Sequence, residues 1–180
     1  YYFSRTFHMW GWATWRRAWK CFDQQMKQWP QLKQTNFLSQ LADGDKYFIN
    51  YWSKIFDMVH AGRDDIWDYQ FTFACWVNHG LSILPSKNLV KNIGFSSDAT
   101  HTLDDGHWFT KLPVQRIGFP LIHPTSIERN VEVDRWSDRH VFGITFIPAL
   151  KSWLKQQPGG DVMVKMYRFS KKLLQRDNKL

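Results

Sequence analysis

The chain has 180 residues, of which 43% are hydrophobic and 22% charged, and its net charge is +8. This length suits one domain or a large part of one, and the composition excludes a chain that is disordered throughout. No stretch approaches the about 18 apolar residues of a membrane-spanning helix. Two cysteines cannot build a disulfide framework, so Cys21 and Cys75 are expected to be reduced, buried thiols, which favours a cytoplasmic protein.

Aromatic residues make up 17% of the chain, and 11 of them are Trp. Indole rings fill cores, but their flat faces also stack on sugars and bases. So many Trp residues in one domain indicate more than core filling.

The first segment, Tyr1 to Phe7, is aromatic and predicts a strand. Gly11 interrupts a bulky run, which indicates a tight turn or a close backbone approach. Thr14 is predicted to cap a helix that contains Arg16 to Trp19. The spacing of Trp12, Trp15 and Trp19 would place them on one face of a helix.

Residues 22–62 predict short helices and loops, with a break at Pro30 and a turn at Asp43-Gly44-Asp45. Aromatic residues at helical spacing predict a core-packed helix from Tyr47 to Val59. Asp68 begins a predicted helix of about three turns, which Gly80 closes as the C-terminal cap.

Two short strands are predicted after this helix, at 81–85 and 88–93. Helices then alternate with strands, so the fold class is expected to be α/β and helix-rich. Residues 95–121 are polar and irregular, and further helices are expected at 128–142, 148–156 and 162–176.

The C-terminal segment is basic, with eight Lys or Arg against two Asp from Lys151 onward. Its last helix is expected to be amphipathic and could bind an anionic membrane surface. A solvated basic helix end is an equally good interpretation, and no specific nucleic acid is expected as a partner.

The run from Trp10 to Trp19 is the first candidate site. Trp10, Gly11, Trp12 and Trp15 would form an open floor with aromatic walls for a saccharide, and Arg16 could hold phosphate or hydroxyls. The alternative is that the helical Trp residues are a core stripe.

Trp67-Asp68 is the second candidate. A carboxylate at a helix N-terminus is stabilised as an anion, and it could act as a general base on a hydroxyl. A simple N-cap is the commoner role of such a residue.

A polar loop supplies the third candidate, with carboxylates and imidazoles that could hold a divalent metal: Asp98, His101, Asp104, Asp105 and His107. Their spacing matches no strong metal motif, so a plain polar loop is the default. The triplet Asp43-Gly44-Asp45 could hold a metal-bound diphosphate, but its glycine favours a turn.

In order, these pieces resemble the C-terminal half of a GT-A fold glycosyltransferase of the family 2 type. They are similar above all to a bacterial subgroup of nucleotide-diphospho-sugar transferases. The motifs are Ser4-Arg5, the run from Trp10 to Trp19, Trp67-Asp68-Tyr69-Gln70, Asn92-Ile93-Gly94-Phe95 and Ala99-Thr100-His101-Thr102. The likeness covers residues 1–142 and implies an acceptor and catalytic half there, followed by a helical basic tail at 143–180.

The resemblance implies an inverting transfer of a sugar from a nucleotide-sugar donor to a glycan hydroxyl. Asp68 matches the catalytic base, and Trp67 stands where the family usually has Glu. Trp10, Gly11, Trp12, Trp15, Arg16 and Trp67 are the implied substrate-binding residues. His101 is the implied ligand of a divalent cation, Mg²⁺ or Mn²⁺.

In the family, a nucleotide-binding half precedes the segment that this chain resembles. The chain is therefore expected to act as an enzyme when joined to such a half, as a cytoplasmic protein at the inner face of the membrane. A non-catalytic carbohydrate-binding or degenerate transferase module is the alternative function, and self-association is a further expectation.

Overall fold

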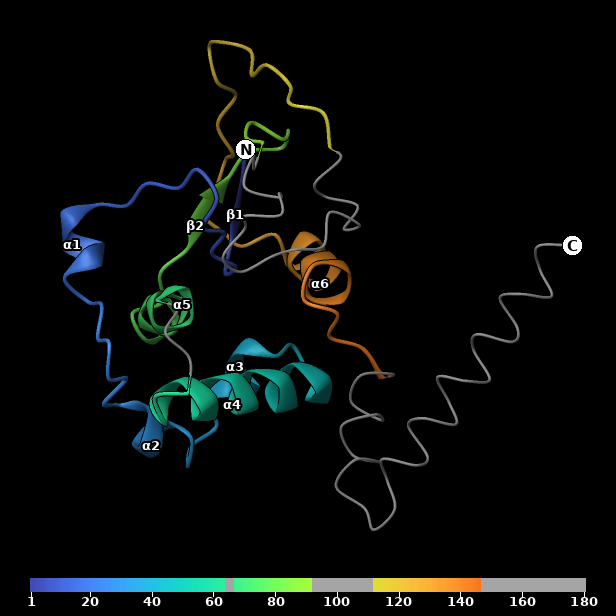
Figure 1. The fold of residues 1–180 in the computed structure, drawn as a ribbon. Coiled ribbons are helices and arrows are strands. Elements are labelled where there is room, and N and C mark those ends of the chain that lie inside the picture. Colours follow the sequence, from blue (N-terminus) through green and yellow to red (C-terminus); the bar gives the residue numbers. More distant parts are fainter. Residues whose placement is uncertain (64–66, 92–111, 147–180) are drawn as a thin grey trace, which may run out of the picture. The chain divides into compact units, whose positions relative to one another are not determined.

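The computed structural model describes residues 1–63, 67–91 and 112–146. Within these ranges the chain forms six helices and two strands (Figure 1). In chain order they are β1 (Tyr2–Ser4), α1 (Arg16–Trp19), α2 (Trp29–Leu32), α3 (Phe37–Leu41), α4 (Lys46–His60), α5 (Asp68–Val77), β2 (Ser82–Leu84) and α6 (Val131–His140). The described part is therefore mostly helical, as expected, but its sheet is small.

The chain divides into two compact units. The first comprises residues 1–27 and 62–135, and the second comprises residues 28–61 and 136–180. Helix α6 begins in the first unit and ends in the second. The predicted division into 1–142 and 143–180 stays a prediction, because nearly all of its second segment lies outside the described residues.

Strands β1 and β2 of the first unit pair antiparallel, with Phe3 opposite Ile83. Phe3 also forms a parallel bridge with Arg129, and the amide of Asn130 donates to the Phe3 carbonyl at 2.7 Å. Both strands that pair here were predicted. The predicted strand at 88–93 is wrong for residues 88–91, which have no regular structure, because Asn88 instead bonds to the backbone of residues 112–115.

Helix α5 crosses the core of the first unit, with seven of its ten residues buried. Its N-cap is Trp67, so Asp68 is the first helical residue and the N-cap interpretation of Asp68 is wrong. At the other end His79 takes the left-handed conformation, and the Gly80 amide donates to the Cys75 carbonyl at 2.8 Å. The helix therefore ends near the predicted place, but the left-handed residue is His79 rather than Gly80.

The second unit is built on α4, whose buried side chains Phe48, Trp52, Phe56 and Val59 recur at helical spacing. Phe56 contacts the rings of Trp29 and Trp52 at centroid distances of 5.2 and 5.4 Å. These residues confirm the core-packed helix predicted at 47–59. Pro30, by contrast, lies in the first turn of α2, where its missing N–H is tolerated, and does not break the structure.

An ion pair at the side of α4 fixes α2 to it. The indole of Trp29 donates to Asp57 Oδ1 at 3.0 Å, and Lys33 Nζ lies 2.7 Å from Asp57 Oδ2. Burial alone would raise the pKa of Asp57, but the hydrogen bonds from Lys33 and Trp29 outweigh it and hold this pKa below its ordinary value.

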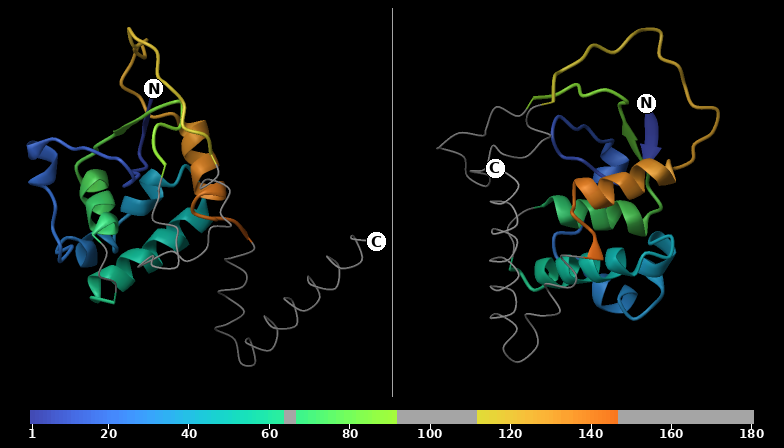
Figure 2. Two further views of the ribbon diagram at one scale, coloured as in Figure 1. Left: turned by 45° about the horizontal axis from the view of Figure 1, so that its top comes forward. Right: turned by 90° about the vertical axis from the view of Figure 1, so that its right-hand side faces the viewer.

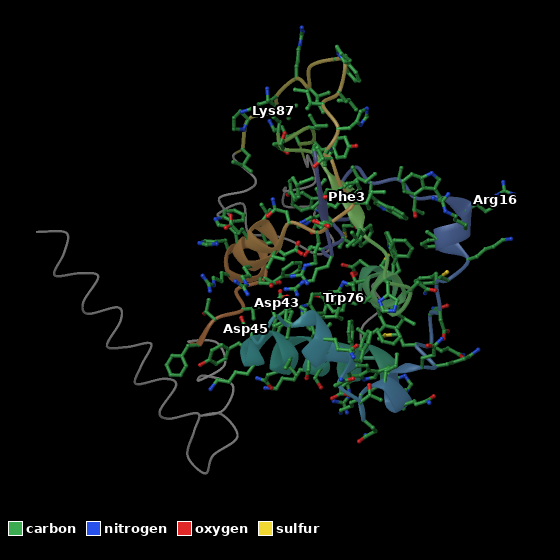
Figure 3. The ribbon with its side chains drawn as sticks, turned by 180° about the vertical axis from the view of Figure 1, so that it is seen from behind. Phe3, Arg16, Asp43, Asp45, Trp76 and Lys87 are labelled. Carbon is green, nitrogen blue, oxygen red and sulfur yellow. The ribbon has the colours of Figure 1, made fainter. Side chains whose placement is uncertain are left out.

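Asp45 begins α4 as its N-cap (Figure 3). Its side chain accepts hydrogen bonds from the amides of Tyr47 at 2.8 Å and Phe48 at 3.3 Å. Asp43 and Gly44 before it both have positive φ. The triplet is therefore a turn that ends in a helix cap, as its glycine predicted, and the Asp45 carboxylate is engaged with the backbone.

Replacing Asp45 by Ala is expected to lower the free energy of unfolding by about 1 kcal/mol, because the first amides of α4 lose their acceptor. Asp45→Asn is the matched control and should cost little, since Asn caps helices about as well as Asp. Urea unfolding followed by circular dichroism measures both. Equal losses in the two variants would show that the charge of Asp45, and not its capping bonds, stabilises the turn.

Candidate functional site

The segment that was predicted to hold a helical Trp stripe is mostly not helical. Helix α1 has four residues, and its N-cap is Trp15, with no side-chain capping bond, so the predicted Thr14 cap is wrong. Trp12 lies before the helix in irregular chain. Trp12, Trp15 and Trp19 therefore do not lie on one face of a helix. Any contact between their rings depends on the irregular backbone before α1.

An aromatic cluster nevertheless forms in the first unit, from Phe7, Trp12, Trp19, Phe22, Trp67 and Phe71. The Trp12 ring lies 5.1 Å from Trp67, 5.4 Å from Phe71 and 5.2 Å from Phe7, centroid to centroid. Trp19 lies 6.0 Å from Trp12 and stacks on Phe22 at 4.8 Å. These contacts join the Gly11 bend, α1 and the start of α5.

This cluster is buried on one side and exposed on the other. Phe71 at its base is buried, whereas Trp67 is 37% exposed and Trp19 is 42% exposed. Trp10 and Trp15, which are close to Trp12 in sequence, are exposed as well. The cluster thus combines the two alternatives that the sequence left open, since it is a small core with indole faces that remain accessible to a ligand.

Gly11 makes the bend possible. Its φ of +65° is in the left-handed region, and a Cβ at this position would collide with the side chain of Val90. The sequence predicted a tight turn or a close approach at Gly11, and the structure shows both.

Two arginines accompany the exposed indoles. The guanidinium of Arg17 lies 5.0 Å from the centre of the Trp15 ring, in cation–π range, and Arg16 is exposed on α1 (Figure 3). No acidic residue lies in the first turn of α1. The surface around Trp15 therefore combines flat apolar rings with positive charge.

Asp68 is next to the aromatic cluster but on a neighbouring stripe of α5. Trp67 and Phe71, one turn apart, contact the cluster, whereas Asp68 continues the stripe of Thr72 and Trp76. Its side chain is 8% exposed, and its carbonyl accepts from Thr72 Oγ1 at 2.9 Å. The backbone thus places this carboxylate one residue from a ring that touches Trp12.

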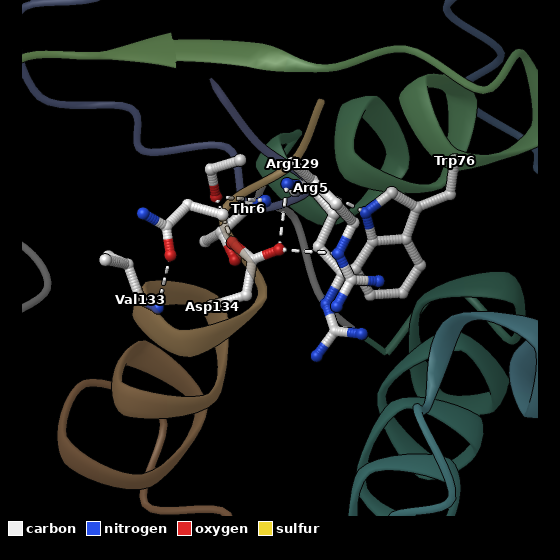
Figure 4. A network of polar contacts seen from close by, with 8 residues as sticks. Arg5, Thr6, Trp76, Arg129, Val133 and Asp134 are labelled. Atoms are coloured by element: carbon white, nitrogen blue, oxygen red, sulfur yellow. Dashed lines mark hydrogen bonds and ion pairs between the residues drawn. The ribbon is translucent and has the colours of Figure 1, made fainter. Parts of the chain in front are cut away.

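A buried polar network that the sequence did not predict lies around Asp134 (Figure 4). Asp134 is 1% exposed, accepts from Ser4 Oγ at 2.5 Å and from the Arg5 amide at 3.3 Å, and lies 3.1 Å from Arg129 Nε. The Trp76 indole donates to the Arg5 carbonyl at 2.8 Å. This network ties the start of the chain to α5 and to α6.

His8 belongs to the same part of the first unit. Burial lowers the pKa of His8 from its ordinary value, and the charge of Asp134 opposes that shift in part. His8 is therefore expected to stay neutral at pH 7. The only sequence signal for this network was the Ser4-Arg5 pair in the family-like motif.

No group of three or more His, Cys, Asp or Glu side chains in residues 1–63, 67–91 and 112–146 is arranged to hold a metal ion. His101 and the neighbouring polar loop lie outside these ranges, so the predicted Mg²⁺ or Mn²⁺ site stays a prediction.

The cysteines differ from the expectation. Both are free thiols, but Cys21 is exposed and Cys75 is only half-buried, so neither is fully buried. Burial raises the pKa of Cys75 to about 11, with a smaller contribution from Cys21, so the Cys75 thiol is protonated at pH 7.

Comparison with known proteins gives no relative: no family model, curated protein or solved structure matches the chain. Among the described residues, none of the helices is both long and apolar enough to cross a bilayer.

Proposed function

We propose that the chain is the acceptor-binding and catalytic part of an inverting glycosyltransferase of the GT-A, family 2 type. The observation that carries this proposal is the contact between Trp12 and Trp67, at 5.1 Å. It brings the glycine bend and the start of α5 together, and these are the two segments on which the resemblance depends. The protein would work in the cytoplasm at the inner face of the membrane.

The exposed rings of the aromatic cluster would bind the sugar. Hexoses present apolar C–H faces that stack on indoles, and the positive charge of Arg16 and Arg17 suits a phosphate or a hydroxyl. Trp10 and Trp15 would extend the same surface, because both are exposed, Trp10 directly before Gly11 and Trp15 at the start of α1.

Asp68 would act as the general base. Its carboxylate would take the proton of the acceptor hydroxyl while that oxygen forms a bond to the anomeric carbon and the bond to the nucleoside diphosphate breaks. Inversion follows, because the acceptor oxygen attacks from the face opposite the leaving group. A divalent cation, if held by His101, would neutralise charge on the departing diphosphate.

A carbohydrate-binding module without catalysis is the second candidate. The same accessible indoles favour it, because stacking requires no carboxylate. The two candidates agree on the binding surface and differ only in the role of Asp68.

The binding surface is tested by replacing Trp67 with Ala. Glycan affinity is expected to fall about threefold to tenfold, since one aromatic face contributes about 0.5–1.5 kcal/mol. Trp136→Ala is the control, because Trp136 is also an exposed indole but lies on α6, outside the aromatic cluster. Calorimetric titration of a glycan panel measures both variants. Equal affinity of wild type and Trp67→Ala for every glycan bound would exclude this surface as the sugar site.

A further inference from the structure

Residues 112–127 form an extended segment, here called the apolar arm, with no helix or strand. It projects beyond β1 and β2 of the first unit (Figures 1 and 2, yellow to orange). Its large apolar side chains face solvent: Phe119 is 79% exposed, Ile122 is 89% exposed and Ile127 is 77% exposed. Such exposure is costly in water, and apolar residues gathered on one exposed element mark an interaction site.

The arm is anchored on both sides of its apolar tip. The Gln115 amide donates to the Asn88 carbonyl at 2.8 Å, and the Asn88 side-chain amide donates to the Leu112 carbonyl at 3.2 Å. Beyond the tip, the Tyr1 hydroxyl and His123 Nδ1 are hydrogen-bonded at 2.8 Å. Residues 116–122 are thus presented by a fixed base.

We propose that the tip of the apolar arm, centred on Phe119 and Ile122, inserts into the interface of an anionic lipid bilayer. Charge favours this occupant, because the one formally charged residue of 112–127 is Arg116, and the segment has no Asp or Glu that an anionic surface would repel. Insertion would be shallow, with the side chains among the upper acyl carbons and the backbone at the level of the headgroups.

The backbone of the arm also suits a lipid interface. An irregular segment next to lipid must avoid leaving amide donors without acceptors. Pro113, Pro120 and Pro124 have no amide N–H, so three of the sixteen residues of the arm carry no donor to satisfy.

This surface is distinct from the basic C-terminal segment, whose membrane binding would depend largely on its positive charge. Salt separates the two, because about 1 M salt shortens the Debye length to about 3 Å and leaves apolar insertion intact. Binding through the arm should therefore persist in high salt, whereas binding through the tail should weaken, and the arm variants below separate the two directly.

The test is co-sedimentation with vesicles of phosphatidylcholine and phosphatidylglycerol in equal parts, at low and at high salt. In high salt, the double variant Phe119→Ser/Ile122→Ser is expected to bind at least about tenfold more weakly than wild type, because each side chain buries apolar area in the bilayer. Ile83→Ser is the matched control and should bind like wild type, since Ile83 is an exposed apolar residue on β2. An unchanged melting temperature of the double variant shows that the fold is kept.

Three results would overturn the proposal. Wild type could fail to bind these vesicles, or the double variant could bind as tightly as wild type in high salt. Alternatively, sedimentation velocity could show that wild type is a dimer and the double variant a monomer, in which case the arm binds a second copy.

Discussion

Asp134→Ala is expected to lower the free energy of unfolding by about 3 kcal/mol, because removing one partner of a buried ion pair leaves the other without compensation. Asp134 has a fully buried side chain, whereas that of Arg129 is 21% exposed, which places the effect at the lower end of the range for such pairs. The Ser4 hydroxyl and the Arg5 amide would lose their acceptor as well. Chemical unfolding at pH 7 measures the loss.

Glu132→Ala is the control for this prediction, since Glu132 is exposed on the same helix and its loss should change stability by about 0.5 kcal/mol or less. Asp134→Asn keeps the shape of the side chain and should fall between the two. A loss no larger in Asp134→Ala than in Glu132→Ala would show that the buried network contributes nothing to stability.

Asp68→Asn is expected to reduce sugar transfer by about 10²- to 10⁴-fold, because a general base contributes rate enhancement of that order. The change removes the basic oxygen but keeps the size of the side chain. The natural full-length protein is incubated with a panel of nucleotide sugars and glycan acceptors, and release of the nucleoside diphosphate is measured. Glycan affinity and melting temperature should remain those of wild type.

Three outcomes of this experiment separate the two candidate functions. Loss of turnover with intact binding supports the transferase. Full retention of turnover in Asp68→Asn removes Asp68 from the base role. Glycan binding by wild type without turnover of any nucleotide sugar supports the carbohydrate-binding module.

The candidate site was predictable where its signals are local. Gly11 marks its own bend, because few residues other than glycine adopt φ near +65°, and a Cβ there would force the side chain of Val90 to move. Asp68 could be placed at the start of a helix because acidic residues are common in the first turn. The sequence could not predict that Trp15 is the N-cap of α1 or that α1 has only four residues. The N-cap of α1 makes no side-chain capping bond, so the sequence holds no capping signal there.

The Asp134 network shows what the sequence conceals. Asp134 lies in the first turn of a helix, where an acidic residue is usually an exposed, favourable charge. It is instead the best-buried carboxylate among the described residues, because the strand segment from Phe3 to Arg5 lies against residues 129–134. Ser4 and Asp134 are 130 residues apart in sequence, so no local pattern predicts their hydrogen bond.

The sequence by itself determined the helices α4, α5 and α6, the turn before α4, the strands β1 and β2, and the bend at Gly11. These depend on apolar periodicity, capping and glycine, which act between residues a few positions apart. Only the tertiary structure decided that Trp12 meets Trp67, that Asp134 is buried against Ser4 and Arg5, and that Phe119 and Ile122 stay exposed. Such contacts join residues distant in sequence, and their energies depend on packing and desolvation that no local pattern encodes.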